Sequence, residues 1–160
     1  MTFYHASTNQ YQIGDLIIHT PGNICVYYPE VNVELDRVKP QDMLGRDSAI
    51  YITNDCAFAK YFISTQHSNS PTFVYEVSTT DILNEHPFAV VHQIDQSIKT
   101  SKNSKVSALS AEYWQPNQKW NFYEYLVSSI TIIDIMHVDD FDIMLAKNPY
   151  FQDVDKAKSI

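Results

Sequence analysis

Glu124 is the residue whose type and setting point most directly to chemistry. It stands inside an aromatic and aliphatic run at 122–127, and an unpaired carboxylate is costly to bury there. An ionised carboxylate held beside a sugar can stabilise the positive charge that develops when a glycosidic bond breaks. If 122–127 is a strand with Glu124 on the cleft side, alternation puts Phe122 and Leu126 beside it and turns the other three residues to the core, namely Tyr123, Tyr125 and Val127.

Several other chemistries are disfavoured by missing motifs. None of the six histidines shows metal-ligand spacing such as His-x-x-x-His, and we expect no metal site. A Gly-x-Ser-x-Gly nucleophile motif is absent, and the three glycines are not clustered. This argues against serine hydrolases of that type, P-loop NTPases and Rossmann dehydrogenases. Cys25 and Cys56 are far apart and form no Cys-x-x-Cys pair, as expected in a reducing compartment.

Length and composition predict one globular domain spanning 1–160, with a frayed tail from about residue 148. The net charge of −8 weakens the case for broad contact with nucleic acid, although the lysines between 99 and 105 leave a nucleic-acid substrate open. With no visible signal peptide and no membrane-length apolar stretch, we expect a cytoplasmic protein without membrane contact. A secreted effector exported by a specialised machine would look the same.

Apolar runs and turn signals predict an α+β domain. Strands are expected at 2–5, 13–18, 49–53, 72–77, 89–94 and 122–135, with a further apolar segment at 24–28. Asn54 or Asp55 caps a helix that runs to about residue 66. Residues 29–48 are expected to form a loop or short helix over a cleft, residues 95–110 a mobile polar linker, and residues 139–145 an amphipathic helix.

Three segments match one family as a group. Tyr-His-Ala-Ser at 4–7 resembles the His-Gly-Ser/Thr motif of diphtheria-toxin-like ADP-ribosyltransferases. Residues 49–55, followed by Ala-Lys-Tyr at 59–61, resemble their Gly-Ile-Tyr-Phe-Ala-Asp segment and the tyrosine on the next helix. Phe-Tyr-Glu-Tyr-Leu-Val at 122–127 is similar to the strand that carries the catalytic glutamate of poly-ADP-ribose polymerases. The chain therefore resembles the His-Tyr-Glu class of this superfamily over residues 3 to about 135, and its opening is also similar to small rifamycin-modifying transferases.

The resemblance implies split antiparallel sheets flanked by short helices around an NAD cleft. It implies a mono-ADP-ribosyltransferase that uses NAD as co-substrate and needs no metal. Glu124, His5 and Tyr51 would be the catalytic triad. In it, Glu124 would stabilise the ribosyl cation and bind the 2′-hydroxyl, and His5 would contact the adenosine ribose.

The same resemblance assigns the remaining NAD contacts. The backbone of Ala6, beside Ser7, would hold the nicotinamide carboxamide, and Tyr51 and Tyr61 would stack on the nicotinamide ring. Phe58 replaces the carboxamide-binding serine of the polymerases, so that contact is not implied here. Arg46 is a candidate for the NAD pyrophosphate.

The acceptor of ADP-ribose stays open among a protein, a nucleic acid and a small molecule. Phe122 and Trp120 are expected on the acceptor side. Phe122 stands where arginine-modifying and Rho-modifying relatives carry Glu or Gln, which favours a hydrophobic or aromatic acceptor. The small size suits a toxin, effector or resistance enzyme, and a toxin or effector role would bring an antitoxin or immunity protein as partner. Two alternatives remain: an RNA 2′-phosphotransferase-like or other nucleic-acid-modifying NAD enzyme, and a catalytically inactive binding module.

Overall fold

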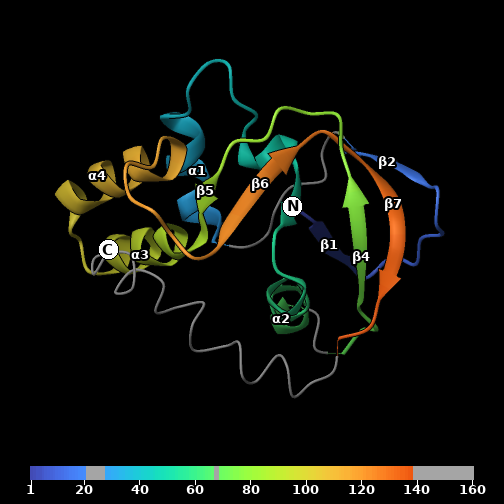
Figure 1. The fold of residues 1–160 in the computed structure, drawn as a ribbon. Helices are drawn as coiled ribbons and strands as arrows, with labels where there is room; N and C mark the ends of the chain where they lie inside the picture. Colours follow the sequence, from blue (N-terminus) through green and yellow to red (C-terminus); the bar gives the residue numbers. More distant parts are fainter. Residues whose placement is uncertain (21–27, 67–68, 139–160) are drawn as a thin grey trace.

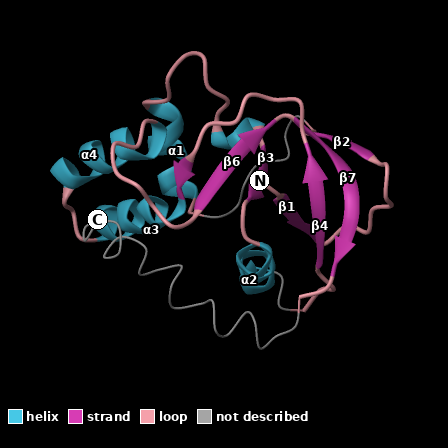
Figure 2. Cartoon of the chain, viewed as in Figure 1, coloured by secondary structure: helices cyan, strands magenta, loops and turns pink. Residues whose placement is uncertain are grey.

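In the computed structural model, which describes residues 1–20, 28–66 and 69–138, the chain adopts an α+β fold. One antiparallel sheet of seven strands is accompanied by four α-helices in this part of the chain (Figures 1 and 2). The strands are β1 (Phe3–Ser7), β2 (Leu16–Ile18), β3 (Ile50–Thr53), β4 (Phe73–Ser78), β5 (His86–Pro87), β6 (Tyr123–Val127) and β7 (Ser129–Met136). The helices are α1 (Pro29–Arg37), α2 (Cys56–Gln66), α3 (Phe88–Lys99) and α4 (Asn103–Trp114), with a short 3-10 helix η1 (Arg46–Ser48).

The sheet has the strand order β2-β7-β4-β1-β3-β6-β5. The strand pairing is shortest near the middle of the sheet, between β1 and β3. β1 pairs with β4 at five positions but with β3 only at Tyr4 opposite Thr53. The expectation of split sheets is therefore corrected, because backbone pairing joins all seven strands in one sheet. The join between its halves, β2-β7-β4-β1 and β3-β6-β5, is one residue pair wide.

A row of polar residues crosses the sheet at this join. Directly opposed residues of antiparallel strands project to the same face, and the register links six of them from β7 to β5: Asp134, Glu76, Tyr4, Thr53, Glu124 and His86. Glu124 therefore lies between Thr53 of β3 and His86 of β5 on one face, whereas His5, which follows Tyr4 in β1, projects from the other face.

The main hydrophobic core extends along the sheet from β4 and β7 to β3 and β6, and α1, α3 and α4 lie together at the β6 end (Figure 1). Every residue of β6 is buried. This corrects the expectation that only the face of Tyr123, Tyr125 and Val127 meets the core, since the face of Glu124 is covered as well. The helix α2 instead packs beside β1, β3 and β4.

Two sequence-based predictions about this end of the molecule are wrong. Residues 89–94, predicted as a strand, begin helix α3, and residues 95–110, predicted as a mobile linker, form the rest of α3 and most of α4. The core positions of α4, which are Val106, Ser110, Tyr113 and Trp114, follow the i, i+4, i+7, i+8 spacing of one helix face. Packing of this narrow face, together with α3, stabilises helices whose exposed sides are polar.

Other predictions are confirmed. The strands at the start of the chain, at 49–53, at 72–77 and at 122–135 form β1, β2, β3, β4, β6 and β7, and part of 29–48 is helical. The α2 cap is Asp55, whose Oδ1 accepts from the Phe58 amide at 2.8 Å. The predicted segment at 24–27, helix at 139–145 and tail lie outside the described residues. No described helix is long and apolar enough to cross a membrane.

Candidate functional site

His5 bridges the two halves of the sheet where backbone pairing between β1 and β3 stops. Its Nδ1 lies 2.8 Å from the carbonyl oxygen of Tyr51. A carbonyl only accepts, so Nδ1 donates and Nε2 keeps a lone pair. Burial lowers the pKa of His5, against an opposing effect of the Tyr51 carbonyl, so the ring is neutral at pH 7. In the described part of the chain Nε2 has no hydrogen-bond partner, and it can accept from a ligand.

Tyr51 continues the chain of contacts from His5 towards η1. Its hydroxyl donates to the Arg46 carbonyl at 2.7 Å, and the Arg46 guanidinium carbon lies 5.1 Å from the centre of its ring. The aromatic ring and the cation therefore attract each other, and Tyr51 holds both the backbone and the side chain of Arg46.

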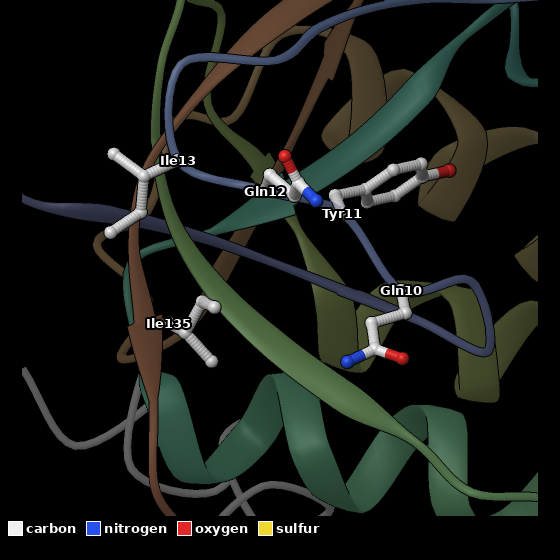
Figure 3. Close-up of a pocket in the computed structure, with 5 residues that line it drawn as sticks. All are labelled: Gln10, Tyr11, Gln12, Ile13 and Ile135. Carbon is white, nitrogen blue, oxygen red and sulfur yellow. The ribbon is translucent and has the colours of Figure 1, made fainter.

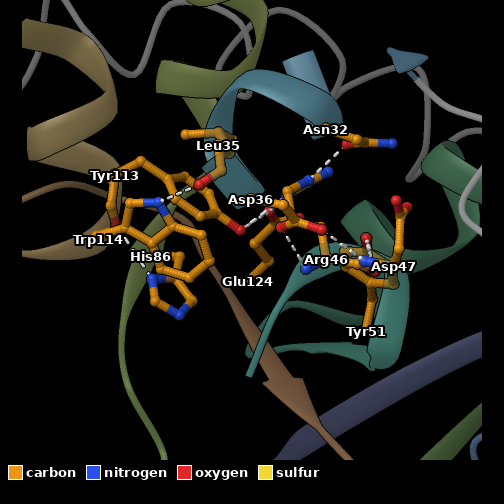
Figure 4. A network of polar contacts seen from close by, with 10 residues as sticks. All are labelled: Asn32, Leu35, Asp36, Arg46, Asp47, Tyr51, His86, Tyr113, Trp114 and Glu124. Carbon is orange, nitrogen blue, oxygen red and sulfur yellow. Dashed lines mark hydrogen bonds and ion pairs between the residues drawn. The ribbon is translucent and has the colours of Figure 1, made fainter. Parts of the chain in front are cut away.

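Arg46 and Glu124 form an ion pair in the interior (Figure 4). Arg46 is 2% exposed and Glu124 5%. The guanidinium also donates to Asn32 Oδ1 at 2.6 Å and to the Tyr113 hydroxyl at 2.7 Å. A buried charge pair is tolerated only when such additional hydrogen bonds satisfy the remaining polar atoms.

The two oxygens of Glu124 are in different situations. Oε1 accepts from Arg46 and from the Tyr113 hydroxyl, the latter at 2.7 Å. Oε2 receives no hydrogen bond from any described residue. Among the described side chains, Asn54 Oδ1 is the single fully buried oxygen or nitrogen without a hydrogen-bond partner. Since Oε2 also lacks such a partner, it is not fully buried. One oxygen is thus fixed by the protein and the other can bind a ligand.

Local structure in α1 and η1 positions Arg46. The Asp36 carboxylate accepts from the backbone amides of Arg46 and Asp47, at 2.8 and 3.3 Å. A Cβ at Gly45 would lie 3.3 Å from both Asp36 carboxylate oxygens, which a glycine avoids. The residues 36–47 therefore fold around one carboxylate, and this turn directs the Arg46 side chain inward.

Apart from Trp120, the remaining predicted site residues fall into two groups. Ala6 and Ser7 end β1, where the Ser7 hydroxyl accepts from the Asn9 amide at 3.0 Å. Tyr61 and Phe122 both pack against the cluster of Phe58 and Phe88, so the predicted nicotinamide and acceptor contacts share one aromatic cluster.

Trp120 is a core residue. It is 4% exposed, its backbone amide donates to the Tyr123 hydroxyl at 2.8 Å, and its indole donates to Glu112 at 2.9 Å. These bonds fix the turn before β6. Because Trp120 is buried, it can affect an acceptor only by positioning this turn and not by direct contact.

Sequence reasoning missed three members of the site, which are Asn32, His86 and Tyr113. His86 stacks on the Tyr113 ring at 4.7 Å between centroids, and its Nδ1 donates to the Tyr113 carbonyl at 3.0 Å. Burial lowers the pKa of His86. Tyr113 follows the segment 95–110, which the sequence predicts as a linker, so no helix is predicted to carry it. Its i+7 spacing from Val106 is the signal that places it on one face of an amphipathic helix.

No group of three or more potential metal ligands occurs among the described residues. One open depression of about 480 Å³ lies on the other half of the sheet, lined by Gln10, Tyr11, Gln12, Ile13 and Ile135 (Figure 3). It contains none of the predicted site residues. Arg46 and Glu124 are the one buried ion pair in the part of the chain that the structure describes.

Comparison with protein-family models and with curated proteins finds no match to this chain.

Proposed function

We propose that the chain is an NAD-dependent mono-ADP-ribosyltransferase. The observation that carries the proposal is a continuous path of contacts joining three residues far apart in sequence. His5 bonds the backbone of Tyr51, Tyr51 holds Arg46, and Arg46 pairs with Glu124. These residues come from the adjacent strands β1, β3 and β6 and from η1. The single residue pair joining β1 to β3 also suits a sheet that divides around an NAD cleft.

In the proposed reaction the bond between the ribose C1′ and nicotinamide breaks, and its electron pair leaves with neutral nicotinamide. The ribose becomes an oxocarbenium-like cation. Glu124 Oε2 accepts the 2′-hydroxyl hydrogen bond and stabilises this cation. A nucleophilic oxygen or nitrogen of the acceptor then forms a bond to C1′ and loses its proton. With water as acceptor, the product is free ADP-ribose.

The other contacts follow the sequence-based hypothesis. His5 Nε2 would accept from a hydroxyl of the adenosine ribose, because Nδ1 is occupied by Tyr51. Since His5 projects from the other face of β1 than the row that contains Glu124, NAD would have to pass across the join to contact both residues. Tyr51 and Tyr61 would bind the nicotinamide ring, and the backbone of Ala6, beside Ser7, its carboxamide.

Arg46 takes a different role from the one first expected. Because it is 2% exposed and its guanidinium bonds Asn32, Tyr113 and Glu124, we assign it as the countercharge of Glu124. The pairing through Oε1 gives the buried carboxylate its countercharge and leaves Oε2 for the substrate.

Phe122 supports a hydrophobic or aromatic acceptor. It lies two residues before Glu124 and packs with Phe58 and Phe88, so it offers no hydrogen bond to a guanidinium. We expect agmatine, an arginine analogue, to be a poor acceptor. Transfer to agmatine as fast as to other acceptors contradicts this assignment.

Of the alternatives, the binding module has one observation in its favour: an ion pair as buried as Arg46–Glu124 also fits a purely structural role. The phosphotransferase alternative needs arginines that grip phosphate. Here Arg46 is buried, and Arg37 pairs with Glu34 at 2.6 Å on the surface.

The test is incubation with NAD labelled in its adenylate half, first alone and then with cell lysate. The enzyme hypothesis predicts nicotinamide release and transfer of label. Label removed by nuclease but not by protease identifies a nucleic-acid acceptor, and the reverse a protein. A labelled small product that is neither NAD nor ADP-ribose identifies a small-molecule acceptor. No nicotinamide release under any condition contradicts the proposal and favours the binding module.

A further inference from the structure

Tyr113 joins both charged groups of the site through one hydroxyl. The hydroxyl oxygen accepts from Arg46 Nη1 at 2.7 Å, and the hydroxyl hydrogen goes to Glu124 Oε1 at 2.7 Å. A guanidinium only donates and a carboxylate only accepts, so the direction of both bonds is fixed. With two donors on Oε1, the protein holds the carboxylate from one side.

We propose that Tyr113 is a positioning residue for Glu124, holding Oε1 so that Oε2 faces the ribose of NAD. This rests on the proposed function, because positioning matters only if Glu124 acts on that ribose. Without the Tyr113 hydroxyl, the carboxylate keeps one bond on Oε1 and can rotate about its terminal torsion, which is broad in free side chains. Catalytic groups need to be held near their productive geometry, so this rotation lowers the rate.

Tyr113 is itself held from several sides. Its side chain is fully buried on α4, the His86 ring stacks on it with an interplanar angle of 14°, and Trp114 meets it edge-on at 4.9 Å. The Arg46 guanidinium carbon lies 5.4 Å from its ring centre. A ring fixed in this way directs its hydroxyl to one place, which is the property a positioning residue requires.

Burial raises the pKa of Tyr113 well above its ordinary value. The phenol therefore keeps its hydrogen, and the bond to Glu124 Oε1 persists over the pH range in which the enzyme would work.

The direct test is Tyr113→Phe, which removes the hydroxyl and keeps the ring. We expect kcat for nicotinamide release to fall roughly 10- to 100-fold, the range for losing a hydrogen bond to a charged group. KM for NAD should change less than about twofold, since the bond serves the transition state and not ground-state binding. A chain with 4-fluorophenylalanine at 113 is the second variant, because it lacks the donor but keeps nearly the full volume of tyrosine.

Tyr75→Phe is the matched control. Tyr75 is equally buried, and its hydroxyl likewise donates once, to the Asn9 carbonyl at 2.9 Å, and accepts once, from the Tyr11 amide at 2.8 Å. It lies on β4, outside the Glu124 network. Both variants should lose stability on heating, with the larger loss in Tyr113→Phe because its hydroxyl bonds charged groups. In contrast, kcat should fall only in Tyr113→Phe. An equal fall in both variants overturns the proposal, because it reduces Tyr113 to a stability effect.

A double variant separates positioning from a general loss of packing. If Tyr113 acts through Glu124, adding Tyr113→Phe to Glu124→Gln should lower the residual rate less than about threefold. A further loss as large as in the wild-type background overturns the proposal. Failure of the proposed function looks different: the wild type then releases no nicotinamide. A wild type that depends on Glu124 but tolerates Tyr113→Phe contradicts the positioning role alone.

Discussion

At the scale of single residues, the account depends on how the protein surrounds a buried carboxylate with partners. Glu124 is paired with Arg46 and also bonded by Tyr113. The desolvation of two charges is offset only when the pair and its hydrogen bonds are complete. Replacing one residue of this buried pair should therefore lower the free energy of unfolding far more than replacing one residue of an exposed pair.

Arg46→Met should destabilise the fold by about 3–5 kcal/mol, because Glu124 is left buried without its countercharge. Urea unfolding measures the loss. Arg37→Met is the control, since Arg37 is exposed and should leave the free energy of unfolding nearly unchanged. Arg46→Met combined with Glu124→Leu should recover most of the loss, because no charge remains unpaired. Equal stability of the two arginine variants contradicts the account.

Stability should also depend on pH through the buried histidines. Burial lowers the pKa of both His5 and His86 below the ordinary 6.5. Between the lowered native pKa and about 6.5, the unfolded chain binds more protons, so stability falls as pH drops below about 6.5. Each histidine contributes up to roughly 1.4 kcal/mol per pH unit in that window.

The check is urea unfolding over that window for the wild type, His86→Phe and, as control, His137→Phe. His86→Phe keeps a ring on Tyr113 but cannot take a proton, whereas His137 is exposed. The slope of the free energy of unfolding against pH should be smaller than in the wild type only in His86→Phe. An unchanged slope in that variant shows that His86 does not oppose protonation in the fold.

At the scale of elements, the narrow join between β1 and β3 is the distinctive feature. One residue pair and the His5–Tyr51 bond connect strands that are otherwise unpaired. In contrast, β1 and β4 share a ladder of five pairs. Opening between the halves should therefore begin at the join, beside the proposed NAD contacts.

His5→Phe tests this directly, because it removes the donor to the Tyr51 carbonyl and keeps an aromatic ring. Losing one hydrogen bond of about 1 kcal/mol should speed amide hydrogen exchange in β3 roughly fivefold. The amides of β4 and β7 serve as an internal control and should keep their protection. Unchanged exchange in β3 means that the His5 bond does not stabilise the join.

The sequence predicts the elements that carry strong local signals and misses those that packing decides. The apolar runs around Tyr51 and Glu124 and the capping Asp55 predict β3, β6 and α2 correctly. The apolar run at 88–91 is ambiguous between strand and helix, and only its contact with α4 makes it helical.

The same limit applies to the site. The types of His5, Tyr51 and Glu124 are visible in the sequence, and their strands prove to be neighbours. The partners that hold Glu124 are not visible, because Arg46 lies on a 3-10 turn and Tyr113 on a helix with a polar exterior. The oxygen of Glu124 that is fixed is determined by contacts with Arg46, 78 residues away in the sequence, and with Tyr113, 11 residues away. No local sequence pattern encodes such contacts.

At the scale of the whole molecule, the fold brings a charged residue from a strand, one from a turn and a phenol from a helix into one interior network (Figure 4). The polar row across the sheet offers a second glutamate for comparison, Glu76 on β4, opposite Tyr4. The two glutamates share a face but differ in partners, since only Glu124 belongs to the network. This pair makes a matched test possible.

The most direct measurement is the single-turnover rate of nicotinamide release from NAD by wild type, Glu124→Gln and Glu76→Gln. The glutamine at 124 can still accept from Arg46 and Tyr113 but lacks the negative charge. We predict a loss of about 100- to 1000-fold for Glu124→Gln, with NAD binding retained, and wild-type behaviour for Glu76→Gln. Release by Glu124→Gln at the wild-type rate, or equal losses in both variants, would contradict the central claim that the Glu124 carboxylate stabilises the ribosyl cation.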